Sequence, residues 1–122
     1  MMGMPKTLPV VDMTAPLCCS PMAAGPIDDD AALDVALRLK ALADPVRVKL
    51  VSLLFSSKDG EVCGCDLATA VGLSESTVSH HLTQLRRAGI VESGRRGMNV
   101  YHRARRESLV ALCTVLDPNC CR

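Results

Sequence analysis

The chain has 122 residues, of which 48% are hydrophobic, and a formal net charge of +1. This length and composition allow one modest hydrophobic core, which excludes a disordered chain and predicts a single domain. Positive charge gathers in residues 74–107, with seven arginines against three acidic residues. With one Phe, one Tyr and no Trp, the chain lacks the stacking surfaces of single-strand and most RNA-binding proteins. The basic segment therefore favours duplex DNA as its partner.

The N-terminal part is broken by prolines. No apolar run approaches the ~18 residues that a membrane-spanning helix needs, so we expect a cytoplasmic protein with no membrane partner. Cytosolic thiols are kept reduced, and the seven cysteines are clustered, which indicates metal or redox chemistry in place of a disulfide framework. Residues 1–28 are predicted to form a flexible arm that carries Cys18 and Cys19.

Helical patterns begin after this arm. Three aspartates precede a helix predicted over about residues 30–43, and Asp44-Pro45 opens a second over about 45–56. The first of these helices and the last one, predicted over about 105–116, carry apolar residues on more than one stripe. One core face cannot bury them all, so we expect a homodimer through the terminal helices.

A helix-turn-helix is predicted in the middle of the chain. A short helix over about 66–71 and a longer one over 75–88 are separated by Gly72-Leu73-Ser74, in which the glycine ends the first helix and the serine caps the second. On the longer helix, the apolar residues Val78, Leu82 and Leu85 fall on one face, and polar residues fall on the opposite face. His81 lies at the edge of the apolar stripe, and we expect a structural role for it.

A basic turn at residues 94–97 between strands at 90–93 and 98–103 predicts a hairpin, the wing. The fold class is thus mainly α with a small β-hairpin, a winged helix-turn-helix. Short polar side chains near the start of a recognition helix can approach base edges, while arginines contact the DNA backbone. The predicted DNA-binding residues are Ser74, Ser76, Thr77, Ser79, His80, Thr83, Arg87, Arg95 and Arg96.

Three segments in this order resemble motifs of the ArsR/SmtB-type repressors. They are Lys40-Ala-Leu-Ala-Asp-Pro-Val-Arg47, Glu61-Val-Cys-Gly-Cys-Asp-Leu-Ala68 and Leu73-Ser-Glu-Ser-Thr-Val-Ser-His-His-Leu82. The resemblance covers about residues 29–116, which we take as the domain, with residues 117–122 as a cysteine-bearing tail. It implies a dimeric transcriptional repressor of metal(loid)-resistance genes that binds operator DNA and is released by an inducer.

Thiolates are soft ligands that prefer soft ions. The resemblance places Cys63-Gly64-Cys65 at the start of the first helix of the helix-turn-helix, where a metal joins that helix to an N-terminal arm in the family. It therefore implies Cys63 and Cys65 as ligands, with Cys18 and Cys19 as their partners from the same or the other subunit. The cysteine spacing matches the cadmium and lead branch, whereas the adjacent pair in the arm also resembles arsenic-sensing members. The effector stays open between As(III) and Cd(II) or Pb(II), with no organic cofactor.

Three further cysteines lie near the C-terminal end of the chain, and the cysteines also allow two alternative functions. Cys113 lies on the apolar stripe of the last helix and is expected in the core, whereas Cys120 and Cys121 form a possible second metal site. The first rival is a repressor with the same fold whose thiols sense redox state or persulfide. The second is a small thiol enzyme such as a metalloid reductase, but no phosphate loop or nucleophile-base pair supports it, and we expect no enzyme.

Overall fold

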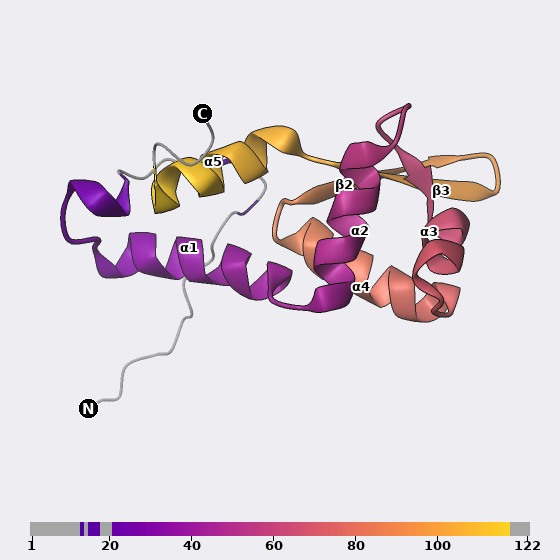
Figure 1. The fold of residues 1–122 in the computed structure, drawn as a ribbon, viewed down its shortest axis with the longest axis horizontal. Helices are drawn as coiled ribbons and strands as arrows, with labels where there is room; N and C mark the ends of the chain where they lie inside the picture. The colour runs from indigo at the N-terminus through magenta and orange to yellow at the C-terminus, as the bar shows by residue number, and fades with distance from the viewer. Residues whose placement is uncertain (1–12, 14, 18–20, 118–122) are drawn as a thin grey trace, which may run out of the picture.

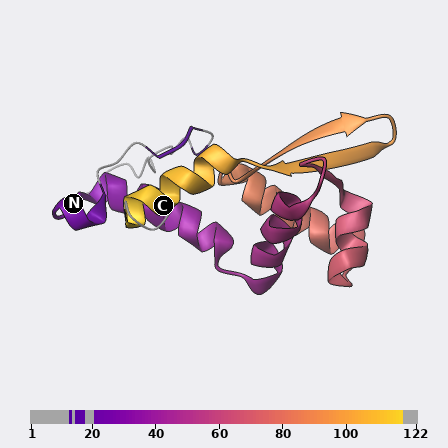
Figure 2. The same cartoon turned by 45° about the horizontal axis from the view of Figure 1, so that its top comes forward.

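The computed structural model describes residues 13, 15–17 and 21–117. Its elements run in chain order as the 3-10 helix η1 (Met22–Ala24), α1 (Asp29–Leu42), α2 (Pro45–Ser56), β1 (Val62–Cys63), α3 (Gly64–Val71), α4 (Glu75–Arg87), β2 (Val91–Arg96), β3 (Asn99–Ala104) and α5 (Arg106–Leu116). Figures 1 and 2 show α1 and α5 side by side at one end of the molecule, with α3 and the β2–β3 hairpin at the other end. The predicted winged helix-turn-helix is confirmed.

The predicted helix starts are confirmed by their caps. The Asp28 side chain accepts a hydrogen bond from the backbone N–H of Ala31 at 2.8 Å, and that of Asp44 accepts one from Val46 at 2.8 Å. These caps satisfy backbone donors that a helix start leaves without partners. Helix α3 begins at Gly64, two residues earlier than predicted, because the Cys63 side chain occupies its N-cap position.

The sheet has three antiparallel strands in the order β1-β3-β2, where the sequence predicted only the hairpin. The third strand, β1, pairs Cys63 with Tyr101 and Val62 with His102. The predicted four-residue turn was also wrong. Gly97 has φ +62°, which allows a two-residue turn, so Arg95 and Arg96 lie in β2 and pair with β3.

The main hydrophobic core lies between α2, α3, α4 and β2. Leu50 of α2, Leu67 of α3 and Leu85 of α4 are fully buried there. A second cluster joins α1 to α5 through Val35, Leu112 and Val115. The two clusters hold the helix-turn-helix and the terminal helices together as one unit.

Part of the segment expected to be a flexible arm packs against the domain. Leu17 and Ile27 contact the cluster between α1 and α5, and Met13 contacts the main core. Arg38, which is buried, donates hydrogen bonds to the carbonyl oxygens of Asp34 at 3.0 Å and Ala15 at 3.1 Å. These contacts hold residues 13 and 15–17 against the domain.

None of the helices in the described part of the chain is both long and apolar enough to cross a membrane.

Candidate functional site

Helices α3 and α4 meet at a tight turn that sets their crossing. Gly72 adopts the left-handed conformation with φ +72°, and its N–H bonds the carbonyl of Ala68 at 2.9 Å, which ends α3. The Ser74 hydroxyl then accepts a hydrogen bond from the backbone N–H of Thr77 at 3.2 Å and caps α4. The turn that the sequence predicted is confirmed.

Helix α4 has one buried face and one polar face. Val78, Leu82 and Leu85 are buried, as predicted. Most of the predicted DNA-binding residues on this helix and its cap are exposed, namely Ser74, Ser76, Thr77, Ser79, His80 and Arg87. Thr83 is half-buried. Because the buried stripe is held by the core, these side chains project from the opposite side of the helix.

Four of these hydroxyls, those of Ser74, Ser76, Thr77 and Thr83, are already engaged within the protein. Ser74 caps α4, and its Oγ also donates to Thr77 Oγ1 at 2.9 Å and lies 3.2 Å from Ser76 Oγ. Thr83 donates to the carbonyl of Ser79 at 2.9 Å and accepts from Arg86 at 3.2 Å. These hydroxyls therefore also stabilise α4 through hydrogen bonds within the protein.

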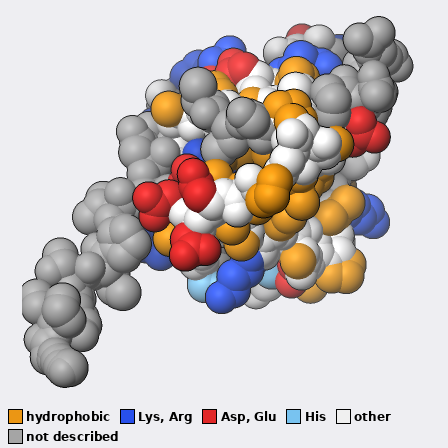
Figure 3. Space-filling view, turned by 90° about the vertical axis from the view of Figure 1, so that its left-hand side faces the viewer, with side chains coloured by type: hydrophobic (Ala, Val, Ile, Leu, Met, Phe, Trp, Pro, Cys, Tyr) orange, Lys and Arg blue, Asp and Glu red, His pale blue; other side chains and the backbone are white. Residues whose placement is uncertain are grey.

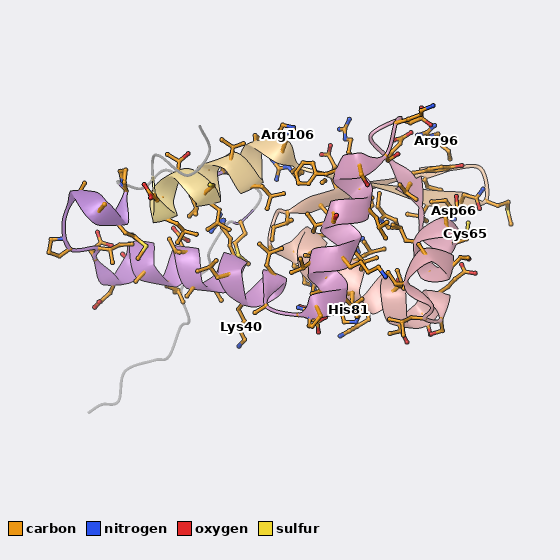
Figure 4. The ribbon with its side chains drawn as sticks, viewed as in Figure 1. Lys40, Cys65, Asp66, His81, Arg96 and Arg106 are labelled. Atoms are coloured by element: carbon orange, nitrogen blue, oxygen red, sulfur yellow. The ribbon has the colours of Figure 1, made fainter. Side chains whose placement is uncertain are left out.

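His81 holds α4 against α2. The Arg47 Nε donates a hydrogen bond to His81 Nδ1 at 3.0 Å. The expected structural role of His81 is confirmed, and its neighbour His80 is exposed. Figure 4 shows His81 between α2 and α4, on the opposite side of the molecule from Arg96.

The two wing arginines have different surroundings, which the sequence alone did not separate. Arg96 forms an ion pair with Glu61, and its guanidinium lies 4.5 Å from the ring centroid of Tyr101. Arg95 instead lines the groove between the wing and α4. Arg96 would have to give up its contacts with Glu61 and Tyr101 to bind a phosphate. Arg95 is therefore the better placed of the two arginines for a phosphate.

This groove, of about 720 Å³, brings part of each set of predicted site residues together. Its lining includes Ser76 and Ser79 from α4, Arg95 from β2 and both Cys63 and Cys65. Three of the nine predicted DNA-binding side chains and the thiol pair therefore share one concave surface. The sequence placed both sets but did not reveal that they line the same groove.

The thiol pair lies at the junction of β1 and α3. Cys63 is buried and Cys65 is exposed, and both are free thiols. The backbone N–H of Cys65 donates to Cys63 Sγ at 3.4 Å, which closes the turn at Gly64. A side-chain hydrogen bond with Cys63 raises the pKa of the Cys65 thiol. Partial desolvation and the nearby charges of Cys63 and Asp66 raise it further, whereas a backbone hydrogen bond at Asp66 lowers it. The pair offers two soft donors on one tight turn.

The structure does not assemble the complete predicted metal site. Among the residues it describes, no group of three or more His, Cys, Asp or Glu side chains lies close enough to hold an ion. Cys18, Cys19, Cys120 and Cys121 lie outside the described residues. Cys113, expected in the core, is half-buried and disulfide-bonded, to neither Cys63 nor Cys65, which are free.

One residue of this groove was missed by the sequence analysis. His102 of β3 is buried, and its Nδ1 lies 2.7 Å from Ser93 Oγ. Burial lowers the pKa of His102, and the positive charge of Arg86 lowers it further, so both effects favour the uncharged ring. Strand alternation places His102 on the same face as Val100 and Ala104, and this pattern would have predicted an inward-pointing side chain.

The sequence profile described as "Bacterial regulatory protein, arsR family" matches residues 44–93. A Staphylococcus aureus protein named "Cadmium resistance transcriptional regulatory protein CadC homolog" is 43% identical over 70 residues, which cover 57% of this chain and 56% of that protein. A Halobacterium salinarum protein, provisionally named an arsenical resistance operon repressor, is 35% identical over 100 residues, with 82% of each chain covered. The chain spans about half the length of several other curated relatives.

A solved structure supports the same relationship. The homodimeric winged helix-turn-helix DNA-binding domain of a Mycobacterium bovis protein, described as a possible ArsR-family transcriptional regulator, has a TM-score of 0.59 and 34% identity. The match covers 75% of this chain and 84% of that one.

The cap at Ser74 predicts a loss of stability on substitution that an exposed serine of the same helix should not show. Ser74→Ala removes the acceptor for the Thr77 N–H, so we expect the free energy of unfolding to fall by about 1 kcal/mol. Ser79→Ala, on the exposed face of the same helix, should change it by less than about 0.5 kcal/mol. Urea denaturation of both variants measures this difference. Equal effects of the two substitutions would show that the Ser74 cap does not stabilise α4.

Proposed function

This chain belongs to the arsR family of bacterial regulatory proteins, and on that premise we propose that it is a DNA-binding transcriptional repressor of metal(loid)-resistance genes. A soft metal(loid) bound by its cysteine thiolates releases it from operator DNA. The observation that carries the proposal is the shared groove, in which Cys63 and Cys65 lie beside the polar face of α4 and Arg95. Membership in a family of regulatory proteins removes the thiol-enzyme alternative.

The polar face of α4 is the proposed reader of DNA. A helix of this kind enters the major groove with its N-terminal side chains toward base edges. The exposed residues Ser76, Ser79 and His80 occupy that part of α4. Arg87 and the wing residues Arg95 and Arg96 supply positive charge for phosphates or the minor groove. Ser74, Thr77 and Thr83 complete this surface, and part of their contribution is to hold α4 in shape.

A second copy of the chain is the proposed partner of the terminal helices. Leu33 and Leu39 of α1 and Val110 and Leu116 of α5 are exposed although large and apolar. Figure 3 shows hydrophobic side chains gathered on the face at this end of the molecule. An exposed apolar patch of this kind marks an interaction site, and a two-fold dimer would present two copies of α4 to two half-sites of DNA. The Mycobacterium bovis relative is described as homodimeric.

The thiol pair is the proposed centre of effector binding. Cys63 and Cys65 are two free soft donors, which fit As(III), Cd(II) or Pb(II) better than a hard ion. Two thiolates do not complete the shell of such an ion. In the fully reduced chain, in which Cys113 forms no disulfide, we assign Cys18 and Cys19 as the further ligands, from the same or the other subunit, and Cys120 and Cys121 to a second site. Relatives named for cadmium resistance and for arsenical resistance support a soft effector and leave As(III), Cd(II) and Pb(II) in the proposal.

A thiol redox switch on the same fold is the second candidate. It is supported by Cys113, which is disulfide-bonded in this structure and is therefore a cysteine in its oxidised state. Oxidation or persulfide formation at the thiols would then replace ion binding as the signal that releases DNA. Release from DNA by an ion under fully reducing conditions separates the two candidates.

The apolar surface of α1 and α5 predicts the oligomeric state. The protein should sediment as a dimer at micromolar concentration. Leu33→Glu combined with Val110→Glu should shift it toward the monomer, because charges would replace apolar contacts. Val48→Glu is the matched control, since Val48 is an exposed apolar residue of α2, away from this patch, and should leave the dimer intact. A wild-type monomer in sedimentation velocity would contradict the proposed dimer.

The two parts of the DNA surface predict different defects. Arg95→Ala should weaken binding to operator and random DNA alike and lower the slope of log K against log salt by about 1, whereas Arg95→Lys should keep the slope. His80→Ala should weaken operator binding by about 1–3 kcal/mol and random DNA much less. Fluorescence anisotropy at several salt concentrations measures both effects. If Arg95→Ala and His80→Ala reduced the two affinities in the same ratio, the assignment of roles would be wrong.

The thiol pair predicts a loss of response without a loss of DNA binding. The Cys63→Ser/Cys65→Ser double variant should bind operator nearly as well as wild type, because serine at position 63 is a preferred N-cap for α3. It should not be released by the ion that releases wild type. Operator release is measured under reducing conditions against arsenite, antimonite, cadmium, lead and zinc.

Cys113→Ser is the control for this measurement, because it removes a cysteine outside the pair. It should keep the wild-type response under the same conditions. If the Cys63→Ser/Cys65→Ser double variant were still released from DNA at the ion concentration that releases wild type, Cys63 and Cys65 would not be the effector ligands. The cysteines of α5 and the tail would then be the candidate sensors.

A further inference from the structure

A run of hydrogen bonds connects α4 to the wing. Arg86 of α4 donates to Thr83 Oγ1 at 3.2 Å on its own helix and to Ser93 Oγ of β2 at 3.3 Å. Ser93 Oγ lies 2.7 Å from His102 Nδ1 of β3. A guanidinium can only donate, so the Ser93 hydroxyl accepts from Arg86, and the tautomer of His102 sets whether the same hydroxyl donates to Nδ1 or accepts from it. The link joins three elements, α4, β2 and β3.

The other side of the His102 ring lies against the thiol turn. A Cβ placed on Gly64 would be 3.3 Å from His102 Nε2, which leaves no spare room between the ring and the backbone that joins Cys63 to Cys65. The backbone of His102 also pairs with β1, since Val62 lies opposite it in the register. His102 is therefore in contact with the thiol segment through its ring and through its strand.

We propose that His102 and Ser93 are positioning residues that couple the Cys63-Gly64-Cys65 turn to α4. This inference rests on the proposed function and names the route by which the occupied thiols act on the DNA-reading helix. The route starts at Gly64, passes through the His102 ring to Ser93, and reaches α4 at Arg86. Nothing in it requires contact between the ion and DNA.

The turn has a reason to move when its sulfurs bind an ion. In this structure the buried Cys63 Sγ accepts the N–H of Cys65, and this hydrogen bond closes the turn at Gly64. An ion bound at Cys63 Sγ would compete with that N–H for the sulfur, which would change the backbone at Gly64. The buried His102 ring has the turn on one side and Ser93 on the other, so a shift of Gly64 displaces the ring and its partner. The shift then reaches Arg86 and Thr83.

Ser93→Ala removes the hydroxyl that links Arg86 to His102, whereas Ser93→Thr keeps a hydroxyl at this position. The measured quantity is the ratio of operator Kd with and without saturating Cd²⁺ or arsenite, for the full chain under reducing conditions. We expect Ser93→Ala to lower this ratio by about 2- to 30-fold, the range found for residues along a coupling network, and Ser93→Thr to restore it. The Kd of the ion, followed by thiolate absorbance, should stay within about threefold of wild type.

Gly64→Ala tests the other end of the route. Its Cβ would press on His102 Nε2, so the ratio should change, whereas Gly94→Ala is the matched control, because a Cβ there meets nothing within 4 Å. The ratio cancels any direct effect of either glycine variant on DNA contact.

The outcomes separate this inference from the proposed function. If wild type is released and Ser93→Ala and Gly64→Ala show the wild-type ratio, the coupling route is overturned while the repressor function stands. If neither ion releases wild type, the proposed function is overturned and this route with it.

Discussion

The burial of one face of α4 determines what the rest of the molecule can present. Val78, Leu82 and Leu85 are inserted into the core between α2, α3 and β2, and this fixes the rotation of α4 about its axis. The opposite face, with its serines and His80, is then exposed. A polar substitution in the buried stripe would cost stability and would also free the helix to turn, so folding and the proposed recognition of DNA would depend on the same three side chains.

The short strand β1 places the thiol pair, Cys63 and Cys65, beside the exposed face of α4. Its pairing with β3 brings Cys63 opposite Tyr101, and the wing then folds over the groove that α4 forms. Glu61, just before β1, holds Arg96 of the wing through an ion pair. The segment that carries the thiols is thus joined to the wing by strand pairing, by an ion pair and by the packing of His102 against Gly64. A ligand bound at the thiols would therefore act on a segment that is supported by the same contacts as the proposed DNA-facing surface.

The elements with strong local signals could be predicted from the sequence. Asp44 before Pro45, the left-handed Gly72 and the cap at Ser74 each dictate a helix end through their own backbone chemistry, and the apolar period of α4 dictates its buried face. β1 could not be predicted, because two residues carry no alternation and depend on pairing with a distant strand. The same reason applies to the ion pair of Arg96 and to His102, whose roles come from neighbours far away in the chain.

The proposed function requires one equilibrium that links ion binding at the thiols to DNA binding at α4. Linkage requires the two effects to be reciprocal, so the most direct measurement is the Kd of Cd²⁺ or arsenite for the reduced full chain, alone and saturated with operator DNA. Operator should weaken ion binding by the same factor by which the ion weakens operator binding, about 5- to 150-fold in typical allosteric proteins. An ion Kd that is identical with and without operator would contradict it.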